Sequence, residues 1–137
     1  MARQTAIPAL EPWLRSVLRI VAGFTFSLHG LQKLFGMFGG LGGHGGSVPF
    51  FSLMSLAGIL ETVGGALIIL GLFTMPTAFI LSGEMAVAYF LQHFPRGFFP
   101  IQNGGELAVL YCFIFLYLFS AGPGPASLDH WVRKKSG

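Results

Sequence analysis

The chain of 137 residues is 53% hydrophobic, 15% aromatic and only 9% charged, and its mean hydropathy is +0.71. Soluble domains carry about 25% charged residues, so this composition excludes an ordinary soluble protein and predicts a single integral membrane domain in contact with the lipid bilayer. The net charge of +3 comes from basic residues that stand mostly near the ends of apolar segments. Because the sequence holds no basic face interleaved with aromatic residues, we expect no nucleic-acid partner.

The first long apolar stretch predicts a transmembrane helix over residues 13–34, because about 20 helical residues span the roughly 30 Å hydrocarbon core of a bilayer. Arginines before the apolar part would also suit a signal peptide. A cleavage site needs small residues, whereas this stretch ends in Gln32 and Lys33, so we expect the segment to be retained as a helix. Residues 1–12 are expected to form a cytoplasmic segment.

A glycine-rich segment over residues 36–49 follows, with seven glycines in fourteen residues. Two interpretations stay open: a flexible periplasmic linker, or a lid whose backbone approaches a ligand or partner closely. No Lys-Ser or Lys-Thr pair follows the glycines. The segment is therefore not a nucleotide-binding phosphate loop.

Three further transmembrane helices are expected over residues 51–72, 76–93 and 104–121. Pro76 suits the first turn of a helix, and the short link before it predicts an antiparallel hairpin. The run Gly-Pro-Gly-Pro at residues 122–125 cannot continue a helix. We expect residues 122–137 to form a cytoplasmic basic tail.

Basic residues are unevenly distributed between the two sides of the expected helices. Two stand on one side, Lys33 and Arg96. Six stand on the side of the termini: Arg3, Arg15, Arg19, Arg133, Lys134 and Lys135. Since the cytoplasmic flanks of membrane helices carry the excess of lysine and arginine, both termini are expected in the cytoplasm. The sequence predicts an all-α protein, a transmembrane up-down four-helix bundle over residues 13–121 that crosses the cell inner (plasma) membrane in several passes.

Three glutamates lie inside or at the edge of the apolar stretches: Glu61, Glu84 and Glu106. A charge at the bilayer centre costs roughly 2.5–3.5 kcal/mol on insertion scales, so each must be paired, protonated or facing a polar cavity. Counting about 1.5 Å of rise per residue places Arg19 close in depth to Glu84 and near Glu61. We expect Arg19, Glu61 and Glu84 to form an intramembrane charge layer with Arg19 as the counter-charge. A purely structural ion-pair network is the alternative.

A second polar layer is expected at the periplasmic mouth of the bundle, formed by His29, Lys33, His93, Asn103 and Glu106. His29 and Lys33 stand one helical turn apart, and Asn103 and Glu106 are three residues apart, so each pair shares a face. This layer is reachable from water, and we expect a ligand there first. In the alternative interpretation the basic side chains only reach toward water and Glu106 stabilises a helix N-terminus.

Metal and nucleophile chemistry have weak support. A di-iron helix bundle uses Glu-x-x-His pairs, and no glutamate here is followed by histidine at that spacing. We therefore predict no metal site, with haem held by His29 and His93 as a weaker alternative. Cys112 is the single cysteine and has no ionisable neighbour at helical spacing. It cannot form an internal disulfide, and we expect it to pack.

Several motifs follow one another over residues 15–130. They are Arg19-x-x-x-Gly23, His29-Gly30-x-Gln32-Lys33-Leu34, Glu61-x-x-Gly64-Gly65, Glu84-Met85-x-x-Ala88-Tyr89, Asn103-Gly104-Gly105-Glu106 and Gly122-Pro123-Gly124-x-x-Ser127-Leu128-Asp129. In this order they resemble the DoxX family of small four-helix integral membrane proteins. Members similar to this chain are linked to the membrane subunit of thiosulfate:quinone oxidoreductases and to membrane oxidoreductase complexes in oxidative-stress defence.

Two functions follow as expectations. In the first, the chain is a subunit of, or partner to, a membrane oxidoreductase system, with a quinone or small-reductant site at the periplasmic end and glutamates that handle the coupled protons. In the alternative, it is a non-catalytic structural or accessory subunit of a larger membrane complex. The residues demand no intrinsic cofactor, so quinone is the one cofactor considered, and both functions imply a protein partner. Whether the chain is itself an enzyme stays open.

Overall fold

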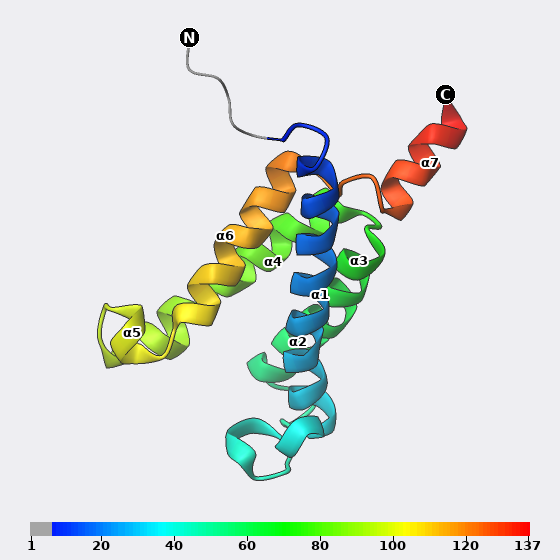
Figure 1. Ribbon diagram of the computed structural model, residues 1–137. Helices are drawn as coiled ribbons and strands as arrows, with labels where there is room; N and C mark the ends of the chain where they lie inside the picture. The colour runs from blue at the N-terminus through cyan, green and yellow to red at the C-terminus, as the bar shows by residue number, and fades with distance from the viewer. Residues whose placement is uncertain (1–6) are drawn as a thin grey trace.

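The computed structural model describes residues 7–137, and within these residues the chain forms helices and loops without a β-strand (Figure 1). The expected all-α class is therefore confirmed for the described part of the chain. Arg3, together with half of the expected cytoplasmic segment 1–12, lies outside the described residues.

Four long helical stretches follow one another. The first is α1 (Glu11–Phe35) and the last is α6 (Glu106–Ala121). The second consists of α2 (Leu53–Ile59), the π-helical turn η3 (Leu60–Gly64) and α3 (Gly65–Leu70). The third consists of α4 (Thr74–Ala88), the π-helical turn η4 (Tyr89–His93) and the 3₁₀ turn η5 (Phe94–Arg96). The shorter elements are the 3₁₀ turns η1 (Met37–Gly39) and η2 (Leu41–Gly43), and the helices α5 (Pro100–Asn103) and α7 (Leu128–Ser136).

Local sequence explains where these helices begin and end. Pro12 lies in the first turn of α1, where its missing N–H costs nothing. The Ser52 hydroxyl caps α2 by accepting a hydrogen bond from the Ser55 N–H at 3.1 Å. Gly36 and Gly71 end α1 and α3 with φ values of +64° and +66°, which glycine adopts without strain.

The outer faces of the helices suit a lipid environment. Two stretches are long and apolar enough to cross a membrane, Leu53–Leu70 and Thr74–Arg96, and α6 is a shorter apolar helix of 16 residues. Phe24, Phe79 and Phe113 point outward with 55%, 58% and 63% of their surface exposed. Large apolar side chains on outer faces are costly in water and favourable against lipid.

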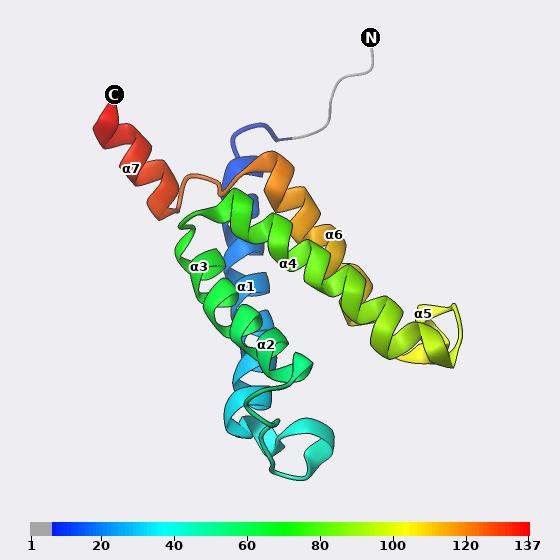
Figure 2. The ribbon, with the colours of Figure 1, turned by 180° about the vertical axis from the view of Figure 1, so that it is seen from behind.

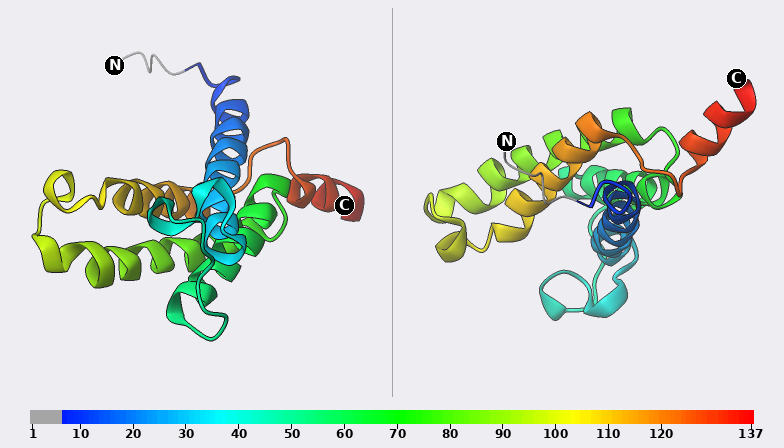
Figure 3. Two further views of the ribbon diagram at one scale, coloured as in Figure 1. Left: turned by 90° about the horizontal axis from the view of Figure 1, so that it is seen from below. Right: turned by 45° about the horizontal axis from the view of Figure 1, so that its top comes forward.

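The long stretches associate as two antiparallel pairs. α1 packs along α2, η3 and α3, and α4 packs along α6 (Figures 1 and 2). The pairs meet where α1 and α4 begin and where α3 and α6 end, which we call the closed end. They diverge toward the glycine-rich segment and α5, which lie far apart and which we call the open end (Figure 3).

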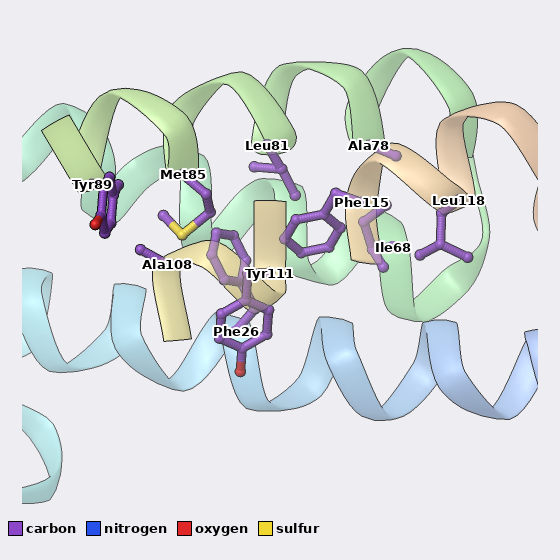
Figure 4. Close-up of a cluster of buried hydrophobic side chains, with 10 residues drawn as sticks. All are labelled: Phe26, Ile68, Ala78, Leu81, Met85, Tyr89, Ala108, Tyr111, Phe115 and Leu118. Carbon is purple, nitrogen blue, oxygen red and sulfur yellow. The ribbon is translucent and has the colours of Figure 1, made fainter. Parts of the chain in front are cut away.

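Aromatic side chains join the two pairs. Phe26 of α1 is 1% exposed, and its ring centre lies 5.1 Å from that of Tyr111 and 4.9 Å from that of Phe115, both on α6 (Figure 4). Ile68 of α3 and Leu81 of α4 are fully buried in the same cluster. This apolar core fixes the pairs to each other at mid-length.

Small residues bring α1 into backbone contact with η3. A Cβ added to Gly30 would lie 2.6 Å from the Thr62 nitrogen and 2.7 Å from the Gly58 carbonyl oxygen. Only a residue without a side chain permits this approach. The contact places the last turns of α1 directly beside Glu61.

Candidate functional site

A cleft of about 590 Å³ lies between the two helix pairs and is lined by residues of α1, α2, η3, α4, η4 and α6. Leu41 of the glycine-rich segment also contributes to the lining. Most lining side chains are apolar. The titratable ones are His29, Lys33, Glu61, Glu84, His93, Arg96 and Tyr111. Ionisable groups are thus concentrated in an apolar space between helices.

Lys33 and Glu61 form an ion pair in this cleft. The Lys33 ammonium nitrogen contacts Oε1 of Glu61, and the two side chains are 14% and 2% exposed. The other carboxylate oxygen, Oε2, has no hydrogen-bond partner among the described residues. Glu61 therefore keeps one free acceptor although its side chain is almost fully buried.

Glu84 reaches the same cleft from α4. Both of its carboxylate oxygens are shielded from solvent, and neither finds a hydrogen-bond partner within residues 7–137. A shielded carboxyl group without a protein donor needs a proton, a water molecule or a ligand group to satisfy it. Glu84 and the free oxygen of Glu61 are therefore the points at which the cleft can engage a polar group.

The side chains of Tyr111 and His29 complete this part of the cleft. The ring of His29 lies edge-on to Tyr111, with 6.2 Å between the ring centres. The Tyr111 hydroxyl donates to the Thr25 hydroxyl oxygen at 2.7 Å. His29 can therefore present a ring nitrogen to a molecule in the cleft, while Tyr111 provides a flat apolar surface.

Two π-helical turns lie at the cleft. Glu61 falls within η3, and His93 is the last residue of η4. A π-helical turn holds one residue more than an α-helical turn, so it changes the direction in which nearby side chains point. Such turns are frequent at functional sites.

Arg19 does not belong to this group, and its expected pairing with Glu61 or Glu84 is wrong. Its side chain is fully buried at the closed end. The guanidinium donates to the carbonyl oxygens of Pro123 at 2.8 Å, Ile68 at 2.5 Å and Ile69 at 2.6 Å, and also to that of Ala126. The last carbonyls of α3 lack the next helical turn that would supply their usual backbone donors, and the guanidinium of Arg19 donates to two of them. Counting residues for depth had assigned these donors to the glutamates.

The polar layer expected at the open end divides into two groups. His29, Lys33 and His93 line the cleft, whereas Asn103 and Glu106 are not among its lining residues. Glu106 is exposed at the start of α6 and forms no ion pair within the described chain. Glu106 is therefore separate from Lys33, which pairs with Glu61 instead.

Asn103 holds the open end of the α4–α6 pair together. Its side-chain nitrogen donates to the Gly97 carbonyl at 2.7 Å and to the Tyr89 hydroxyl at 3.2 Å. Its side-chain oxygen accepts from the Gly105 N–H at 2.8 Å. Nδ1 of His93 lies 3.2 Å from the Asn103 carbonyl oxygen, which orients the imidazole at the rim of the cleft.

Sequence reasoning did not identify Tyr111, an aromatic member of the lining. Ala108 and Tyr111 are three residues apart on α6 and both line the cleft, so the shared helix face was a usable signal. Across residues 7–137, no three His, Cys, Asp or Glu side chains gather closely enough to hold a metal ion.

Comparison with known proteins gives two matches of different kinds. The family model described as DoxX matches residues 14–94, a range that contains Lys33, Glu61 and Glu84. A protein from Haemophilus influenzae, described as "Uncharacterized protein", is 47% identical over 128 residues, which cover 91% of this chain and 95% of that protein. No solved structure matches the chain.

Proposed function

Since this chain belongs to the DoxX family of membrane-associated proteins, we propose that its cleft binds a quinone or a small reductant. In this role the chain is a subunit or partner of a membrane oxidoreductase. The observation that carries the proposal is the set of unpartnered carboxylate oxygens of Glu61 and Glu84 in an apolar cleft. The cleft volume of about 590 Å³ falls in the usual range of small-molecule sites, roughly 300–1,000 Å³.

The proposal includes a topology. The four long stretches form an up-down four-helix bundle in the inner (plasma) membrane, with both termini in the cytoplasm. Arg15 and the basic residues 133–135 lie toward the closed end, whereas Lys33 and Arg96 lie toward the open end. This distribution supports a cytoplasmic closed end and a periplasmic open end.

The residues of the cleft are suited to moving protons beside an electron acceptor. A bound quinone takes up two electrons from the partner oxidoreductase and two protons, and so becomes a quinol. Lys33 can donate a hydrogen bond to an oxygen of the bound molecule while Glu61 holds its ammonium group in place. Glu84 can hold a proton in the apolar cleft and pass it on.

Binding of a short-chain benzoquinone to the full chain in lipid nanodiscs tests the proposal. We expect Glu84→Leu to weaken binding about twofold to tenfold, because the protonated Glu84 carboxyl donates a hydrogen bond to a quinone oxygen and a neutral hydrogen bond is worth about 0.5–1.5 kcal/mol. Equilibrium dialysis measures the dissociation constants. Glu106→Leu is the matched control, since that carboxylate is exposed and lies outside the cleft lining, and it should bind as the wild type does. Equal binding by Glu84→Leu and the wild type, or no binding by the wild type, contradicts the proposal.

An accessory role is the second candidate, and the exposed aromatic residues of the open end favour it. Phe50 and Phe51 are 74% and 97% exposed, and Phe98 and Phe99 are 63% and 61% exposed. Aromatic residues on an outer surface are typical of contacts with a partner or with the membrane interface. If a partner copurifies and its activity is the same with Glu84→Leu as with the wild type, the accessory role replaces the first proposal.

A further inference from the structure

A second cavity, of about 200 Å³, lies at the closed end, on the side of the molecule away from the open cleft. Its walls come from four elements that are distant in sequence: α1, the start of α4, the end of α6 with the residues that follow it, and α7. The lining residues are Arg15, Met75, Ser120, Ala121, Gly122, Pro123, Gly124, His130 and Arg133.

This cavity is basic. Arg15, His130 and Arg133 line it, and no acidic residue does. Arg15 also keeps an unused donor: Nη1 donates to the Ala121 carbonyl, but the shielded Nε has no hydrogen-bond partner among the described residues. Glu11 Oε1 is 3.5 Å from this Nε, so it balances charge without satisfying the N–H. Two guanidinium groups and a histidine around a small space suit the negative charge of a phosphate group.

The helix that supplies His130 and Arg133 is amphipathic. Leu128, Trp131 and Val132 of α7 are 38%, 54% and 49% exposed, and their spacing places them on one face. Three basic residues follow in the last turn of α7, at positions 133–135. The Lys135 ammonium lies 3.8 Å from the centre of the Trp131 ring. Basic residues beside an exposed tryptophan are typical of a helix that lies in the membrane interface.

α7 is also fixed in place relative to the other helices. Its Asp129 carboxylate accepts hydrogen bonds from the N–H groups of Phe73 and Thr74, each at 2.9 Å. The Asp129 N–H donates to the Gly71 carbonyl at 2.9 Å. These contacts hold the first turn of α7 against the start of α4, while the rest of α7 extends away from the helix pairs (Figure 3). His130 and Arg133 are therefore held at the cavity.

We propose that the closed end binds the phosphate of an anionic phospholipid headgroup, and that α7 lies in the plane of the same membrane surface. Arg15 and Arg133 contact the phosphate, and the face formed by Leu128, Trp131 and Val132 enters the lipid interface beside it. A lipid is favoured over a free phosphate ion because this apolar face adjoins the basic cavity. The closed-end site is independent of what the open cleft binds.

Retention of lipid by the purified full chain tests the site. We expect native mass spectrometry to detect bound phosphatidylglycerol after extraction from mixed phosphatidylglycerol and phosphatidylcholine membranes, in at least tenfold excess over phosphatidylcholine. Arg133→Gln should reduce this preference several-fold. Arg96→Gln, which removes a charge at the open end, should leave it unchanged. Arg15→Gln should also reduce the preference, but it removes the donor of the Arg15–Ala121 hydrogen bond. Arg133→Gln is the cleaner test, because Arg133 is exposed and its replacement leaves that hydrogen bond intact.

Two further measurements separate a lipid site from a general anion site. In a Trp13→Phe background the single remaining tryptophan, Trp131, should shift its fluorescence to shorter wavelength in phosphatidylglycerol vesicles more than in phosphatidylcholine vesicles. Inorganic phosphate should displace the lipid only at far higher concentration. Equal retention of the two lipids, equal preference in Arg133→Gln and the wild type, or displacement by phosphate at concentrations equal to those of the lipid overturns the proposal.

Discussion

Glu61 places one carboxylate oxygen against Lys33 and leaves the other without a partner among the described residues. The pair is far apart in the sequence and is formed only because α1 and η3 approach closely. A charge left alone at a site that is 2% exposed is costly. The stability of the molecule should therefore depend on the pair much more than on an exposed ion pair.

We predict that Lys33→Met lowers the free energy of unfolding by about 3–5 kcal/mol, because it leaves a buried charge without its partner. The double variant Lys33→Met/Glu61→Leu should recover most of this loss, since it removes both charges. Chemical unfolding in detergent measures both effects.

Arg96→Met is the control for this pair, because it removes a basic side chain that is exposed at the rim. It should change the unfolding free energy by less than about 0.5 kcal/mol. A Lys33→Met variant as stable as Arg96→Met would show that the ion pair does not hold the helices together.

Residue types were predictable from the sequence, but residue partners were not. The rarity of charges in apolar stretches identified Glu61 and Glu84 without any structure. The partner of Glu61 depends on the register between two helices, and counting residues from helix ends does not give that register. Arg19 illustrates the same limit. Its guanidinium donates to backbone carbonyl oxygens, and the sequence does not indicate which carbonyls are free to accept a hydrogen bond.

At the scale of helices, the contact between α1 and η3 depends on glycine. The position of Gly30 against Thr62 and Gly58 leaves no room for a methyl group. Gly83 of α4 has the opposite surroundings, with no atom within 4 Å of an added Cβ. The two glycines therefore form a matched pair of sites for one substitution.

We predict that Gly30→Ala destabilises the protein by about 1–3 kcal/mol, the usual cost of an overpacked contact. Gly83→Ala should be neutral or stabilising by up to about 1 kcal/mol, because alanine is the better helix former. The midpoint of thermal unfolding in one detergent compares the two variants. If both substitutions have the same effect, close approach at Gly30 is not what positions α1.

Hydropathy predicted the long helices well and the short ones poorly. The expected helix over 51–72 corresponds to the observed stretch Leu53–Leu70, and the one over 104–121 to Glu106–Ala121. α7 was not expected, because its apolar residues are few, and residues 122–137 were expected only as a cytoplasmic basic tail. The Ser127 hydroxyl, which accepts from the His130 N–H at 3.1 Å, was the signal for a helix start there. The π-helical turns leave no such signal.

At the scale of the whole molecule, the divergence of the two pairs creates the cleft. An apolar stretch indicates that a helix exists and how long it is, but it carries no information on the angle at which two helices cross. The sequence therefore predicted four helices with alternating directions but not the space between the pairs. The residues that line this space could be identified only once that angle was known.

The proposed topology predicts which loops are reachable from each side of the membrane. In a Cys112→Ser background, Ser47→Cys of the glycine-rich segment should react with a membrane-impermeant maleimide in intact cells. Ser136→Cys at the end of α7 should react only after the membrane is opened. Both serines are exposed, so protein packing does not limit the reaction. Reaction of Ser136→Cys in intact cells contradicts cytoplasmic termini.

The four carbonyls bound by Arg19 have a consequence for biosynthesis. Ile68 and Ile69 follow Arg19 by 49 and 50 residues, whereas Pro123 and Ala126 follow it by 104 and 107 residues. Since a chain is made from its N-terminus, the guanidinium lacks two of its four acceptors until the segment that follows α6 has been made. A chain that stops after α6 would carry an incompletely satisfied charge at a buried position. The burial of the first helix therefore depends on carbonyl groups that are made more than 100 residues later.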